Sequence, residues 1–69
     1  MTAASAKRHL HNGEMLMAVA ARVPELMADG DTVVDHLAAQ AVQRVLLDVA
    51  QAEFDLCRDE LTAIREVAA

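Results

Sequence analysis

The sequence predicts an all-α protein, a helical hairpin that pairs with a second copy of itself as a dimeric antiparallel four-helix bundle. The stretch after Gly30 contains no further Gly or Pro and is rich in Ala, Leu, Gln, Glu and Arg, which favours one long helix. The 69 residues are 55% hydrophobic and 1% aromatic. A core of this size seldom folds without a disulfide, a metal or a partner subunit. The single cysteine, Cys57, excludes an internal disulfide.

The first part of the chain contains a helix over 14–28, because its apolar residues follow a period near 3.6. Pro24 either kinks this helix or begins a fresh short turn. Residues 1–12 are either mobile or a short helix that ends at Asn12-Gly13, unless this pair only weakens a longer helix. Residues 1–28 therefore form one kinked helix or two. The periodic residues are Met15, Leu16, Val19, Val23, Leu26 and Met27.

Asp29-Gly30-Asp31 is predicted to be the turn between the helices. Gly30 suits the left-handed position after a helix, and Asp31 or Thr32 can cap the next one. The following helix is expected over 31–67, a length of roughly 50–55 Å. The whole chain, 1–69, is thus expected to be one all-helical domain.

Two apolar stripes run along the expected long helix and cover about half its circumference. A compact 69-residue chain has a radius of gyration of about 11 Å, so the first thirty residues cannot enclose such a helix. One stripe therefore needs a second chain, most simply in a two-fold dimer. The first stripe is Ala38, Val42, Val45, Val49, Ala52, Leu56 and Ala63, and the second is Leu47, Ala50, Phe54, Cys57, Leu61, Ile64 and Ala68.

The second stripe, with Leu47, Ala50, Phe54, Cys57, Leu61 and Ile64, is the expected self-association interface. Met15, Val19 and Met27 form an adaptable apolar surface for another protein. Cys57, between Phe54 and Leu61, is expected to be a small core residue and not a nucleophile.

The formal net charge of −5 opposes binding to nucleic acid or to an anionic membrane. No stretch reaches the eighteen uncharged apolar residues that a membrane span requires. The region around Met15–Ala21 only superficially imitates an export signal, because Gly13 and Glu14 interrupt it. A cytoplasmic location is therefore expected.

Glu53 lies between the two stripes and shares its heptad position with Glu60. A carboxylate in an apolar arc must be paired, protonated or metal-bound. Pairing with Arg22 or Lys7 of the same or another chain is favoured. The alternative is a metal site built from His36, Glu53 and Glu60, although the Glu-x-x-His spacing of di-iron bundles is absent.

The sequence has three histidines, each a potential metal ligand. His36, Gln40 and Gln43 either line a small polar pocket, or belong to a solvated helix start or an interhelical hydrogen-bond network. His9 and His11 would point about 200° apart on a helix, so we expect them to be exposed and not to chelate a metal together.

No phosphate-binding Gly-rich loop, Cys/His zinc spacing or G-x-S-x-G motif is present. The leading interpretation is a non-enzymatic interaction protein, a small accessory subunit, scaffold or regulator that uses self-association and helix-in-groove contacts without a cofactor. The alternative is a metal- or ligand-binding bundle, including a small enzyme. A weaker possibility is a dimeric helical enzyme using side chains such as Arg22, Arg44, Gln40 and Gln43.

Overall fold

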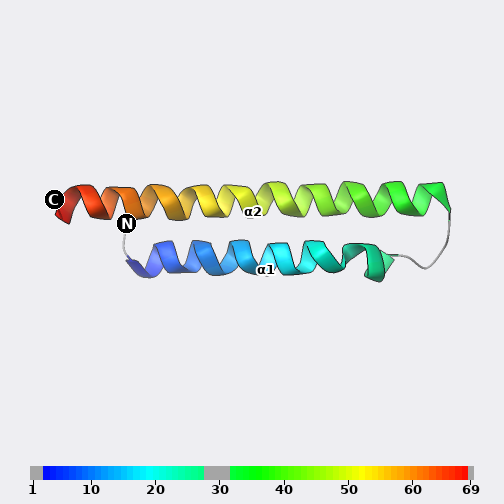
Figure 1. The fold of residues 1–69 in the computed structure, drawn as a ribbon, viewed down its shortest axis with the longest axis horizontal. Coiled ribbons are helices and arrows are strands. Elements are labelled where there is room, and N and C mark those ends of the chain that lie inside the picture. The colour runs from blue at the N-terminus through cyan, green and yellow to red at the C-terminus, as the bar shows by residue number, and fades with distance from the viewer. Residues whose placement is uncertain (1–2, 28–31, 69) are drawn as a thin grey trace.

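The computed structural model describes residues 3–27 and 32–68, which form two α-helices packed against each other as an antiparallel hairpin (Figure 1). Helix α1 spans Ala3–Met27 and helix α2 spans Val33–Ala68. The all-helical hairpin agrees with the sequence prediction. The turn predicted at Asp29-Gly30-Asp31 lies outside the described residues.

Helix α1 is continuous through Asn12-Gly13, where the sequence left open whether a short helix ends or a longer one is only weakened. The physical reason is tertiary. Gly13 is buried against α2, and the ring of Phe54 occupies the space that a Cβ atom would need. Packing over this contact offsets the cost of about 1 kcal/mol that glycine carries inside a helix. Pro24 lies within the same helix, one turn before its end.

Helix α2 is capped by Thr32, one of the two residues predicted for this role. The Asp35 amide donates to Thr32 Oγ1 at 3.1 Å, and the Thr32 hydroxyl donates to Asp35 Oδ2 at 2.8 Å. This reciprocal arrangement resembles a capping box and satisfies one of the free N–H groups at the helix start. Asp35 also places an acidic group in the first turn, where it complements the helix dipole.

The seam between the helices follows a heptad pattern of alternating three- and four-residue spacings. It buries only small or medium residues: Ala6, Gly13, Ala20 and Val23 from α1, and Ala39, Ala50 and Cys57 from α2. No large side chain among the described residues is fully buried. The half-buried seam positions are His9, Leu16 and Met27 on α1, and Gln43, Leu46, Glu53, Glu60 and Ile64 on α2.

The hairpin measures 55 × 14 × 12 Å and has a radius of gyration of 16.1 Å. A compact chain of this length would have a value of about 11 Å. Helix α2 extends past the start of α1 at its C-terminal end (Figure 1). Each helix therefore has one neighbour, and the faces on both sides of the seam are uncovered. Neither described helix has an apolar stretch that could cross a lipid bilayer.

Candidate functional site

A polar cluster interrupts the apolar seam near the start of α1. Nδ1 of His9 lies 2.6 Å from Oε2 of Glu53, and Nε2 of His9 lies 3.5 Å from Oε1 of Glu60. The ionised carboxylate of Glu53 can only accept a hydrogen bond, so Nδ1 is the donor. The side chains of His9 and Glu53 are each 22% exposed, and that of Glu60 is 13% exposed. This is a partly desolvated setting in which charged groups need partners.

One expectation about these residues was wrong. His9 is not an exposed side chain of an N-terminal segment, since it lies on the seam one turn from Ala6 and Gly13. Among the described residues, the partner of Glu53 is His9, and no contact to Arg22 or Lys7 is found. The usable signal was the spacing of His9 three residues after Ala6 and four before Gly13, which places it on the face that packs against α2.

Glu60 completes the polar cluster. Its Oε1 accepts a hydrogen bond of 2.9 Å from the Ser5 hydroxyl, while its Oε2 is buried with no hydrogen-bond partner in the described structure. A buried oxygen without a donor is costly, so the cluster is only partly satisfied. This cost lies on the seam itself, beside the Cys57 thiol, which is free and buried.

The metal triad of His36, Glu53 and Glu60 is not assembled within one chain. His36 lies in the first turns of α2, and Glu53 follows it by seventeen residues, a separation of roughly 25 Å along a helix. The described residues contain no group of three or more His, Cys, Asp or Glu side chains arranged to hold a metal ion. His9 and the two carboxylates do not form one either, because the imidazole bridges the carboxylates through opposite nitrogens.

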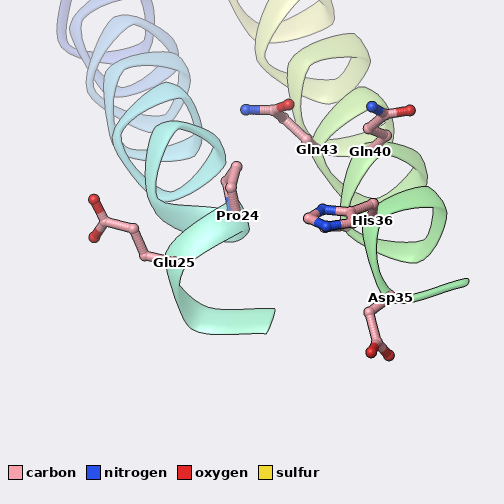
Figure 2. Close-up of a pocket in the computed structure, with 7 residues that line it drawn as sticks. Pro24, Glu25, Asp35, His36, Gln40 and Gln43 are labelled. Atoms are coloured by element: carbon pink, nitrogen blue, oxygen red, sulfur yellow. The ribbon is translucent and has the colours of Figure 1, made fainter. Parts of the chain in front are cut away.

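A cavity of about 510 Å³ lies at the other end of the hairpin, between Pro24 of α1 and the first turns of α2. His36, Gln40 and Gln43 all line it, as the pocket reading of the sequence expected. Figure 2 shows His36 and Gln43 pointing toward α1, whereas Glu25 and Asp35 point away. The acidic groups at this end therefore do not converge inside the cavity.

Gln43 makes an interhelical hydrogen bond, as one alternative interpretation of His36, Gln40 and Gln43 expected, but its acceptor was not foreseen. Its Nε2 donates a hydrogen bond of 2.9 Å to the Ala20 carbonyl. In an uninterrupted helix this carbonyl would accept from the amide of residue 24, but that residue is proline and has no N–H. Gln43 thus supplies from α2 the donor that Pro24 removes from α1. The sequence signal for this contact is Pro24, four residues after the seam residue Ala20, because it leaves the Ala20 carbonyl without a backbone donor.

Two apolar faces flank the seam, one on each side, and we name them by their commonest residue. The leucine face holds Lys7 at its border, because Lys7 and Leu10 line one shallow cavity with Leu61. Met15 and Val19 line another on the opposite side. The leucine face is Leu10, Met17, Leu47, Phe54 and Leu61, and the valine face is Met15, Val19, Val42, Val45, Val49 and Leu56. All are exposed except Phe54, which is half-buried.

The residues expected to form an interface are divided between these surfaces. Ala50 and Cys57 are buried in the seam against α1, and Ile64 is half-buried. Leu47, Phe54 and Leu61 belong to the leucine face. Of the surface expected to bind another protein, Met15 and Val19 are on the valine face, while Met27 is half-buried on the seam side of α1.

The described fold defines the class of molecule, an antiparallel helical hairpin with a small-residue seam and two uncovered apolar faces. No protein-family model, curated protein or solved structure matches this chain.

Proposed function

We propose that this protein is a non-enzymatic helical interaction protein, a small accessory subunit, scaffold or regulator that acts through helix–helix contacts. The observation that carries the proposal is the exposure of fifteen large hydrophobic side chains among the described residues, set against a seam that buries only small ones. Contiguous exposed apolar surface on so small a chain is typical of protein–protein interfaces.

The proposed assembly is a homodimer in which two hairpins form an antiparallel four-helix bundle. A hairpin that is 55 Å long and two helices wide has apolar side chains on both sides of its seam. A second hairpin would cover one of these faces along its whole length, which a compact single chain of this size cannot do. The other face stays available for a helix of a different protein.

The polar groups support binding rather than catalysis. The cluster at the seam pairs His9 with two carboxylates, and Gln43 is committed to a backbone carbonyl. These contacts hold the two helices together, as does the hydrogen bond from the Ser5 hydroxyl to Glu60. The free thiol of Cys57 fits the reducing environment of the cytoplasm, the location we propose.

Sedimentation equilibrium of the full chain at micromolar concentration tests this proposal. We expect twice the 7.4 kDa mass of one chain, with a helical far-UV circular dichroism spectrum. A well-folded monomer throughout that concentration range would refute the self-association. Elemental analysis serves as a second arm: stoichiometric iron, manganese or zinc that is lost in Glu53→Ala would favour the metal-binding alternative.

A further inference from the structure

The two apolar faces differ in the charges along their edges. On the valine face, the α1 edge carries Arg8 and Arg22, and the α2 edge carries Asp59, with Asp55 one turn before it. On the leucine face, the α2 edge carries Arg44, Arg58 and Arg65, while the α1 edge has one charge of each sign, Lys7 and Glu14. The valine face therefore has a basic edge and an acidic edge, and the leucine face does not.

We infer that the valine face is where a second copy of this chain docks, with α1 of each copy lying on α2 of the other about a two-fold axis parallel to the helices. The inference rests on the proposed self-association and specifies its surface. A rotation about such an axis brings the basic α1 edge of one copy beside the acidic α2 edge of its mate. The face is thus complementary to itself, as an isologous dimer requires.

The level of the charges along the helices supports this arrangement. Ser5 bonds to Glu60 and His9 bonds to Glu53, so Arg8 lies level with the Glu53–Glu60 segment of α2. An axis parallel to the helices preserves these levels, which places Arg8 near Asp59 of the other copy. Both Asp55 and Asp59 already lie within 3.6 Å of Arg58 on their own helix. The new pair is therefore a rim contact that sets the register, and apolar burial supplies the affinity.

The size of the valine face is sufficient for a stable dimer. The face is two helices wide over the 25 residues of α1, about 37 Å. Two packed helices are roughly 20 Å wide with their side chains, so this strip covers about 740 Å². Standard stable interfaces bury about 800 Å² on each partner. The middle of the strip carries no charged side chain at the α2 edge position of Asp59, since Ala52 and Val45 lie one and two heptads before it.

The leucine face is a poorer surface for self-docking. The same two-fold rotation would place Arg58 close to Lys7 of the other copy. A perpendicular axis would place the edge of Arg44, Arg58 and Arg65 against itself. Like charges across an interface oppose association. The sequence alone favoured this side, with Leu47, Phe54 and Leu61, because periodicity does not show that Ala50 and Cys57 of the same stripe are buried against α1.

A matched pair of variants tests which face is used. Val49 and Leu47 lie two residues apart on α2 and are 45% and 42% exposed. We expect Val49→Asp to weaken dimerisation by at least about a hundredfold, because it buries an unpaired charge in the interface. We expect Leu47→Asp to keep the dimer mass. Sedimentation velocity of full-length variants over a concentration series measures both, and circular dichroism reports helicity.

The outcomes separate this inference from the proposed function. A wild-type chain that is monomeric refutes self-association itself. A wild-type dimer that is dissociated by Leu47→Asp, or left intact by Val49→Asp, overturns only the assignment to the valine face.

A cross-linking measurement covers the case in which Val49→Asp unfolds. In a Cys57→Ala background, a chain carrying Met15→Cys is mixed with a chain carrying Val45→Cys and treated with a short bismaleimide. We expect cross-links between the two different chains, because α1 of one copy faces α2 of the other. Cross-links confined to identical chains would overturn the arrangement. The control replaces Met15→Cys with Met17→Cys on the leucine face and should give no cross-link.

Discussion

At Gly13 the ring of Phe54 on α2 lies directly against the backbone of α1. A Cβ atom at this position would lie 2.5 Å from Cε1 of Phe54 and 2.8 Å from both Cδ1 and Cζ. Such distances are far below van der Waals contact, so any larger residue must displace the ring. Glycine therefore serves packing here rather than chain reversal, which is how Asn12-Gly13 can lie inside a continuous helix.

We expect Gly13→Val to destabilise the hairpin by about 1–3 kcal/mol, because the added side chain collides with the Phe54 ring. In a Phe54→Ala background the same change should cost much less, since the colliding ring is gone. Urea unfolding at a fixed protein concentration gives both free energies and their coupling. Equal costs in the two backgrounds would contradict the contact as the cause.

Pro24 and Gln43 show a second effect at the residue scale. The backbone N–H that proline lacks is replaced by a side-chain donor from the other helix. We expect Gln43→Leu to destabilise the wild-type chain by about 1–2 kcal/mol, because the Ala20 carbonyl loses its donor. In Pro24→Ala the amide of residue 24 can take over the carbonyl, so Gln43→Leu should then be nearly neutral. A double-mutant cycle by urea unfolding measures this coupling. Gln40→Leu, at the same cavity but pointing away from α1, is the control.

At the scale of the elements, α1 and α2 are held together by a seam that is apolar over most of its length and polar at His9, Glu53 and Glu60. Small residues allow the helices to approach closely but bury little area, so the seam provides modest hydrophobic stabilisation. The polar cluster gives the seam its register. A one-turn slip of α1 along α2 would separate His9 from Glu53 and leave two carboxylates facing apolar side chains.

We expect His9→Leu to destabilise the hairpin by about 1–2 kcal/mol, since Glu53 loses its donor while it stays partly buried. The double variant His9→Leu/Glu53→Leu should recover the part of this loss that comes from Glu53, because an apolar pair can replace a buried polar one. Glu60 keeps its hydrogen bond from Ser5 but still lacks its contact with His9, so recovery is incomplete. Thermal unfolding at a fixed concentration compares them. His11→Leu changes an exposed histidine two residues away and should be neutral. A double variant no more stable than His9→Leu alone would contradict this account.

At the scale of the whole molecule, the extended hairpin exposes fifteen large hydrophobic side chains among its described residues, whereas none of the described large side chains is fully buried. If two copies cover one face each, folding and association are one equilibrium, and the melting temperature depends on protein concentration. Taking an unfolding enthalpy of about 0.7 kcal/mol per residue, we expect a rise of roughly 10 °C for a hundredfold increase in concentration. Differential scanning calorimetry at several concentrations measures the shift. A constant melting temperature would indicate that the hairpin is stable by itself.

The sequence by itself determined that the chain is helical and folds back as a hairpin. Residue composition, the absence of Gly and Pro after Gly30, and the cap at Thr32 are local properties, so they could be predicted without knowing any neighbour. The sequence also singled out Glu53 as a carboxylate that needs a partner.

Only the tertiary structure decided which residue is the partner of Glu53. It also decided which apolar residues of α2 are buried against α1. The seam runs along the edge of the second stripe that holds Ala50 and Cys57, because small residues there and on α1 permit the closest approach of the helices. This packing brings His9 to Glu53, which is 44 positions away in the sequence, and Gln43 to Ala20, which is 23 positions away. Periodicity reports which faces of a helix are apolar, whereas the fit of one backbone against another decides which of them meet.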